Sequence, residues 1–291
     1  MTGARLLADL PFERYQSLPG LNWSTLKHAL TSARHYRLAV DGESAPSDAD
    51  FSGHHAMHAA VLEPETYADR YRVWTGATRR GKEYDAACAA DPQVTWLTAS
   101  ADETARAVAA AVAAHPVAGP LLQAPEGGRA WSEATVVWSE GGRVHKGRLD
   151  RLVWSRDRRV IVDLKAVQSL QPRKMAATVA RYHYHGQAAH YAAGLRALEA
   201  AQGLAPAPID AYLVCYETRP IVDVGVYYLG SHELDGAIWT GARLRDEAIA
   251  RIAAAETAGV WPGQAPETVA LELPAWAYGD DDDDYTEAYR D

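Results

Sequence analysis

The sequence predicts an α/β protein in which a central mixed β-sheet is flanked by helices. Three β-type runs follow one another between residues 131 and 167, and two more follow a helical region at 172–202. Stretches with helical periodicity precede, separate and follow these runs. No internal repeat and no linker divides them, so we expect one domain over residues 1–279. A flexible acidic tail at 280–291 is expected to follow it.

The N-terminal part is expected to be helical and to wrap onto the sheet. Residues 24–40 form one predicted helix, with capping side chains just before it and Leu26, Leu30 and Tyr36 along a buried stripe. The next residues, 41–50, are polar and rich in turn formers, which predicts a loop. Two more helices are predicted ahead of the strands, at 51–63, ended by Pro64, and at 98–114, with an acidic first turn.

The strands are expected to form antiparallel hairpins wherever the connections between them are short. The turns SEGG and SRDR join the first three runs and have lengths that β-hairpins commonly use. The predicted strands are 131–138, 143–154, 158–167, 209–217 and 221–230. A long amphipathic helix is predicted at 232–259.

Composition excludes several classes of protein. No apolar run approaches the ~18 residues that a membrane span needs, and no export signal is visible, so no membrane partner and a cytoplasmic location are expected. Cys88 and Cys215 lie far apart, which excludes a disulfide scaffold, a four-cysteine zinc site and a four-cysteine iron–sulfur cluster within one chain.

The net charge of −9 says little about a nucleic-acid partner. Residues 280–291 carry seven acids and one Arg, a charge of −6, which leaves −3 for the rest of the chain. A nuclease needs positive potential only along its DNA groove, and bound metal ions add local charge.

The most informative residues lie on the second and third predicted strands. Period-two alternation places Ile161, Asp163 and Lys165 on one face of a strongly apolar strand. Burying such charges costs several kcal/mol unless they are paired or bind a metal. Asp150, on the neighbouring strand, shares a face with Lys146 and Arg148, and the hairpin can bring it close to Asp163.

Two carboxylates held close together repel each other, and a divalent cation relieves that repulsion. Hard carboxylate oxygens suit Mg²⁺ or Mn²⁺, which assist phosphodiester hydrolysis, and Lys165 is placed to orient the attacking water or stabilise developing negative charge. The alternative is a structural Asp–Lys–Asp ion-pair cluster at a strand end, because a pattern as short as D-x₁₂-D-x-K also recurs by chance.

At these residues the sequence resembles the PD-(D/E)xK nuclease superfamily, whose signature is Asp, a variable gap, then Asp or Glu-x-Lys on adjoining strands. Here the signature is Asp150 in KGRLDRL and Asp163-Leu164-Lys165 in VIVDLKA. Four further stretches are similar to the RecE-type (exodeoxyribonuclease VIII-like) branch of phages and prophages, and the resemblance spans roughly residues 20–278. They are GHHAMHAAVLEPE at 53–65, RRGKEY at 79–84, SEATVVW at 132–138 and YHYHGQAAHYAAGL at 182–195.

The resemblance implies a restriction-endonuclease-like core and processive 5′→3′ digestion of linear double-stranded DNA from its ends. It also implies one or two Mg²⁺ or Mn²⁺ ions, a homo-oligomeric ring around DNA, and a RecT-type single-strand annealing protein as partner in phage-type homologous recombination.

The resemblance also assigns roles to individual residues. The implied metal ligands are His58, Asp150, Asp163 and the backbone carbonyl of Leu164, with Glu133 helping to hold a second ion or its waters. Lys165 is the implied water-positioning residue, supported by Gln187 and Tyr191. The expected contacts to the DNA backbone are Arg79, Arg80, Lys82, Lys146 and Arg148.

Each assignment has a structural alternative, since a histidine on an apolar helix usually serves packing, and Glu133 also fits a strand-edge charge. Two other functions stay open. One is an endonuclease or single-strand nuclease of repair or defence, and the other is a catalytically inactive DNA-binding protein of the same fold.

Overall fold

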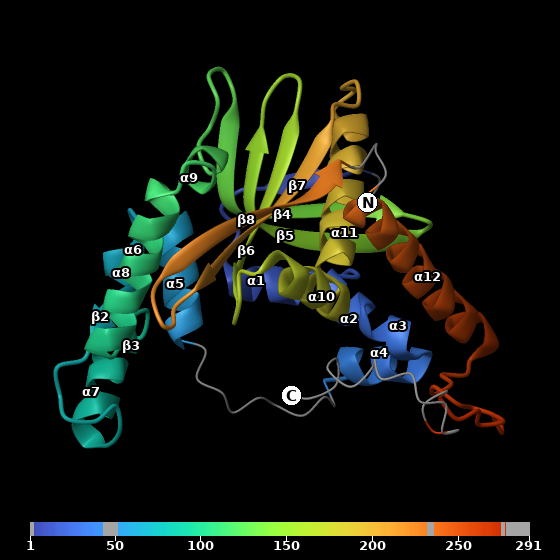
Figure 1. Cartoon of the computed structure of the whole chain (residues 1–291), viewed down its shortest axis with the longest axis horizontal. Helices are drawn as coiled ribbons and strands as arrows, with labels where there is room; N and C mark the ends of the chain where they lie inside the picture. Colours follow the sequence, from blue (N-terminus) through green and yellow to red (C-terminus); the bar gives the residue numbers. More distant parts are fainter. Residues whose placement is uncertain (1–2, 43–51, 232–235, 275–276, 278–291) are drawn as a thin grey trace.

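The structure, a computed structural model, describes residues 3–42, 52–231, 236–274 and 277. Its main sheet has the strand order β1-β4-β5-β6-β7-β8, and all neighbours run antiparallel except β6 and β7. The sheet is therefore mixed, as predicted (Figure 1). The strand bounds are β1 Arg5–Leu7, β4 Arg129–Glu140, β5 Arg143–Trp154, β6 Arg159–Ala166, β7 Ile209–Glu217 and β8 Asp223–Ser231.

Both predicted hairpins are present. β4 and β5 pair from Arg129↔Trp154 to Glu140↔Arg143, and β5 pairs with β6 from Trp154↔Arg159. The parallel neighbours β6 and β7 need a longer crossover, which α10 (Pro172–Tyr182) and α11 (Tyr184–Ala201) provide. The predicted helical region at 172–202 is thus two helices, separated at His183 by a left-handed backbone with φ 56°.

Helices cover both faces of the sheet, as the alternation in β6 requires. Val162 and Leu164 pack in one core with α5 (Ser52–Leu62), α8 (Ala99–Ala114) and α9 (Ala118–Leu121). Ile161 packs in the opposite core with α10, α11 and the start of α12 (Ala237–Ala258). Figure 1 shows α5 and α8 to one side of the sheet and α11 and α12 to the other.

The prediction of one helix over residues 24–40 is wrong. The region contains α2 (Trp23–Leu26), α3 (His28–Thr31) and α4 (Ala33–Val40), which follow α1 (Phe12–Ser17). Ser32 breaks the run because its backbone is extended and its Oγ accepts a hydrogen bond from His35 N at 3.2 Å, which caps α4. Leu26 and Tyr36 are nevertheless buried, against Ile252 of α12.

An arm beside α8 was not anticipated from the sequence. It contains α6 (Tyr67–Arg70), β2 (Tyr71–Val73), α7 (Lys82–Ala90) and β3 (Thr95–Leu97), with β2 and β3 paired in parallel. Trp74 packs edge-on against Tyr84 and Trp96, with ring centroids 5.3 and 5.8 Å apart. RRGKEY therefore runs from a turn into α7, at the outer end of the arm in Figure 1.

Within the described ranges, no helix has the length and apolar character that crossing a bilayer requires. The predicted acidic tail, and the predicted loop apart from residues 41–42, lie outside the described residues.

Candidate active site

The site forms where β5 and β6 separate. Their pairing runs from Trp154↔Arg159, next to the turn, only to Arg151↔Val162. Asp150, the residue before Arg151 in β5, therefore lies just beyond the paired region. Its Oδ2 accepts a hydrogen bond from the backbone N–H of Leu164 at 2.7 Å. The hairpin therefore brings Asp150 beside the segment Asp163-Leu164-Lys165, as the sequence predicted.

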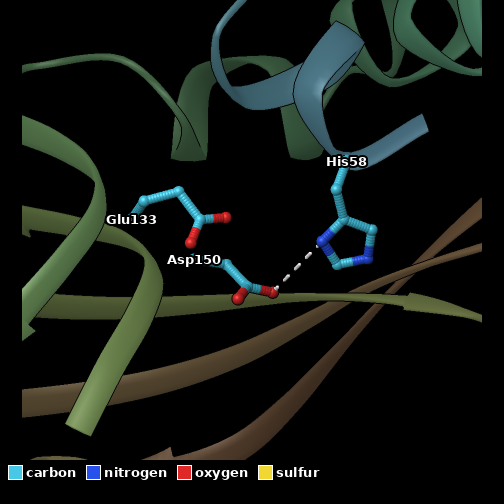
Figure 2. A group of neighbouring side chains, drawn as sticks. All are labelled: His58, Glu133 and Asp150. Carbon is cyan, nitrogen blue, oxygen red and sulfur yellow. Dashed lines mark ion pairs between the residues drawn. The ribbon is translucent and has the colours of Figure 1, made fainter. Parts of the chain in front are cut away.

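Two further side chains converge on Asp150. His58, from α5, has its Nδ1 3.9 Å from Asp150 Oδ2, and Glu133 belongs to β4 beside it. One ligand atom of each lies within 4.8 Å of the others. Figure 2 shows the imidazole and both carboxyl groups facing a shared space. A nitrogen and two carboxylate oxygens make a donor set suited to a divalent cation.

The backbone of Glu133 is unusual for a strand. Its φ is 52°, and the ladder skips it, pairing Ser132 with Arg151 and then Ala134 with Leu149. A left-handed conformation of this kind costs a non-glycine residue ~1–3 kcal/mol and persists only where its surroundings enforce it. One such contact is the ion pair from Arg148 Nε to Glu133 Oε2, at 2.6 Å.

The acids of the site resist ionisation in the protein without metal. Burial, and then the charge of Asp150, raises the pKa of Glu133 to about 7. Burial also raises the pKa of Asp150, against the opposing charge of Lys165. Burial and Lys165 lower the pKa of His58 to about 4, so its imidazole is neutral at pH 7, the form that binds metals. Burial is the first cause of all three shifts, so the site disfavours charge on each of these side chains when no metal is bound.

Asp163 and Lys165 form an ion pair beside this group. The Asp163 side chain is buried; its Oδ2 contacts the Lys165 ammonium, and its Oδ1 has no hydrogen-bond partner among the described residues. Burial raises its pKa to about 6, and the charge of Asp150 adds to the increase while Lys165 opposes it. Asp163 does not belong to the compact group of His58, Glu133 and Asp150.

Gln187 and Tyr191 lie next to Asp163, as expected from their predicted supporting role. They line a small enclosed space with it, and Gln187 Nε2 donates to Tyr191 Oη at 2.8 Å. Gly147 of β5 permits this packing, because a Cβ there would lie only 2.8 Å from Tyr191 Cδ1. Sequence reasoning missed Tyr184, whose ring centre lies 5.0 Å from Lys165 Nζ.

The expected DNA contact of Lys146 is wrong. Its side chain is buried, and its ammonium donates to the carbonyls of Tyr15 at 3.0 Å and Leu18 at 2.6 Å, and also to that of Gln16. Lys146 anchors the α1 region to the sheet. Arg148 is likewise used internally, since it binds Glu133 and the carbonyl of Leu10 at 2.6 Å. We therefore describe Arg148 as a positioning residue for Glu133.

The other predicted DNA contacts lie on the arm. Arg79 donates to the carbonyl of Trp96 at 3.1 Å, while Arg80 and Lys82 are exposed. The residues nearest the acids are instead those of a cleft of about 870 Å³ that includes His58, Glu133 and Arg148. The segment Ala8–Glu13 forms part of its wall, so the N-terminal residues contribute to the approach to the site.

Known proteins resemble this chain in sequence and in fold. Residues 22–271 match a family described as "PDDEXK-like domain of unknown function (DUF3799)". No curated protein matches the sequence. A solved structure from Eubacterium rectale, named "Putative exonuclease", has a TM-score of 0.55 at 12% identity, over 91% of this chain and 96% of that one. At this identity the likeness concerns the fold alone. The structure of SSO0001 is 19% identical over 42% of this chain and 50% of that one, and its TM-score of 0.26 carries no argument.

Proposed function

This chain belongs to the family of PDDEXK-like domains, a nuclease fold, and from that membership we propose that it is a metal-dependent exonuclease acting on linear double-stranded DNA. One observation carries the proposal: His58, Glu133 and Asp150 gather their ligand atoms within 4.8 Å of one another. Lys165 lies close enough to depress the pKa of His58 and to oppose the raised pKa of Asp150.

The residues present fit a divalent cation. Two acids with raised pKa values face a neutral imidazole, and the buried Oδ1 of Asp163 has no hydrogen-bond partner in the described chain. In the proposal, His58, Glu133, Asp150 and Asp163 hold Mg²⁺ or Mn²⁺, together with the carbonyl of Leu164. Such an ion supplies Lewis acidity toward the scissile phosphate and lowers the pKa of water.

The side chains then have separate tasks. Lys165, paired with Asp163, directs its ammonium at the attacking water and the developing negative charge. Attack on phosphorus expels the 3′-oxygen of the neighbouring nucleotide and leaves a 5′-phosphate. Arg148 fixes Glu133, while Gln187 and Tyr191 restrict Asp163 from the side of α11. Phosphate contacts carry no sequence information, so low sequence specificity is expected.

The finer features rest on the RecE-type resemblance. We propose digestion from DNA ends in the 5′→3′ direction, a ring of identical subunits, and a RecT-type annealing protein as partner. Comparing linear with closed circular duplex separates this proposal from an endonuclease, because an exonuclease leaves the closed circle intact.

The decisive experiment is digestion of end-labelled linear duplex with Mg²⁺, and with chelator in place of Mg²⁺. Asp163→Ala and Lys165→Ala should fold and bind DNA, yet release nucleotides more than ~100-fold more slowly, the upper range for groups that only support a metal site. Asp246→Ala is a matched control, since the Asp246 side chain on α12 is 73% exposed. Full activity of Lys165→Ala, or of the wild type in chelator, would refute the proposal.

A further inference from the structure

A second hollow lies on the other side of the β4 edge from the catalytic cleft. It has a volume of about 710 Å³ and is enclosed by residues 4–7, the start of β4, the β5–β6 turn and the end of α11. Its size falls within the ~300–1,000 Å³ typical of ligand sites. None of the residues assigned to the active site lines this hollow.

The charge of this hollow differs from that of the catalytic cleft. Three arginines line it, Arg5, Arg129 and Arg156, and none of its described lining residues is acidic. The cleft, by contrast, has five acids among its lining residues, including Glu133. An anion approaching the hollow therefore meets positive charge without a competing carboxylate in its wall.

The side chains of two of these arginines bind no other residue that the structure describes. Arg129 and Arg156 are exposed, and neither forms an ion pair or a side-chain hydrogen bond with any residue that the structure describes. Arg148, Arg151, Arg159 and Arg245, by comparison, all bind protein groups. Arginines that are unpaired in an acid-free hollow are suited to phosphate groups.

Two tryptophans give the hollow an aromatic wall. The guanidinium of Arg159 lies 3.8 Å from the ring centre of Trp154 and so occupies one of its faces. Trp131, which is half-buried, has no aromatic or cationic partner against its ring among the described residues. An aromatic ring beside phosphate-binding arginines is the combination that single-stranded nucleic acids use, because an unpaired base can stack on it.

The hollow is continuous with the site through β4. Trp131 lines both the hollow and the catalytic cleft, and the N-terminal segment lines the hollow with residues 4–7 and the cleft with residues 8–13. β1 pairs with β4 only from Thr135 to Val137, so the outer edge of residues 129–133 has no strand partner in the described structure. Trp131 and Glu133 are two residues apart on that edge.

We propose that this hollow binds a single-stranded segment of the nucleic acid substrate, with phosphates on Arg129 and Arg156 and an unpaired base against Trp131. The proposal rests on the nuclease function and adds a subsite to it. A strand that passes the metal ligands reaches the hollow over the β4 edge. Duplex DNA does not fit this role, because its bases are stacked on one another and cannot reach the ring.

The test is binding of a fluorescein-labelled single-stranded oligothymidylate, followed by anisotropy in chelator so that no cleavage occurs. The double variant Arg129→Ala/Arg156→Ala should bind roughly tenfold or more weakly, the scale of losing groups worth ~1.4 kcal/mol or more. Removing two phosphate contacts should also reduce the slope of log K against log salt by about 1.4. Arg243→Ala, an exposed arginine over Trp239 on α12, is the matched control.

Trp131→Leu should weaken oligonucleotide binding without changing the salt slope, since a base contact neutralises no phosphate. An unchanged Kd and slope in the arginine double variant, or no binding by the wild type, would overturn the subsite. Failure of the nuclease proposal would give a different result. The wild type would then bind the oligonucleotide through these arginines, yet release no nucleotide from duplex with Mg²⁺.

Discussion

Strand β6 carries a buried charge cluster near each end, and the two clusters differ in how their charges are satisfied. At its start, Arg159 Nε lies 3.0 Å from Glu199 Oε1, and Arg196 Nη1 binds Glu199 Oε2 at 2.6 Å. The backbone N–H of Ala207 also donates to Glu199, at 3.3 Å. Both oxygens of this carboxylate are therefore held by the protein itself.

Near its other end, β6 presents Asp163 and Lys165 to a buried site in which the pKa values of Asp150, Asp163 and Glu133 are raised first by burial. Lys165 is paired with Asp163 Oδ2, but Asp163 Oδ1 has no hydrogen-bond partner among the described residues, and the charge of Asp150 raises the pKa of Glu133. Glu133 also keeps a left-handed backbone. The difference teaches how a structural ion-pair cluster can be told from a functional one. In the structural cluster, protein groups bind both carboxylate oxygens of Glu199. In the functional cluster, a buried oxygen of Asp163 is left free by the described residues to bind a cation.

The largest expected effect sharpens the structural side of this comparison. Glu199→Gln leaves Arg159 buried without its counter-charge, which should lower the free energy of unfolding by ~3–5 kcal/mol. Urea unfolding at pH 7 measures it. Nuclease activity per folded molecule should remain close to that of the wild type, because Glu133, Asp150 and Asp163 are untouched.

Glu247→Gln is the control for that measurement, since Glu247 lies on the surface of α12 and pairs with an arginine in an i,i+4 arrangement. Its effect should stay below ~1 kcal/mol. A Glu199→Gln protein as stable as this control would show that Glu199 does not compensate the buried charge of Arg159.

The next effect concerns the functional side. Asp150→Asn removes one carboxylate of the group that includes Glu133 and His58, so activity should fall more than ~100-fold, beyond the loss expected for an outer partner of a metal ligand. The same change removes a like charge from a buried site, so the metal-free protein should be at least as stable as the wild type.

Thermal melting with and without Mg²⁺ tests both parts. The wild type should melt at a higher temperature with Mg²⁺, because binding to the folded state adds ~2.7 kcal/mol at a hundredfold excess over Kd. Asp150→Asn should lose this rise. A variant that melts lower than wild type in chelator would mean that Asp150 is a structural residue.

The sequence was sufficient for strands β4 to β8 and for Asp150, Asp163 and Lys165, because these are local signals. Period-two alternation and short turns place β4, β5 and β6 in order, and charges within an apolar strand mark Asp163 and Lys165. Ser32 illustrates the limit of local signals: the same residue type fits a helix interior and a helix cap, and in the structure Ser32 caps α4. The three-residue strands β2 and β3 are too short to show any period.

The roles of Lys146 and Arg148 could not be read from the sequence. Arg148 lies at the site, where it binds Glu133. Lys146 and Arg148 also donate to the carbonyls of Leu18 and Leu10, 128 and 138 residues earlier in the chain. The unusual backbone of Glu133 was also unpredictable, since no residue type there demands a positive φ. Long-range contacts, rather than the local pattern, decide that these two cations bind groups within the protein.

The smallest expected effect isolates the strain at Glu133. Glu133→Gly relieves the left-handed backbone, which should raise the free energy of unfolding by about 1 kcal/mol in metal-free protein, after allowing for the entropy that glycine loses on folding. Glu133→Ala removes the same carboxylate and its contact with Arg148 but keeps the φ of 52°. The difference between the two variants in urea unfolding therefore reports the backbone alone. Equal stabilities would mean that position 133 is unstrained, and the contrast with the Arg159 cluster would then rest on charge only.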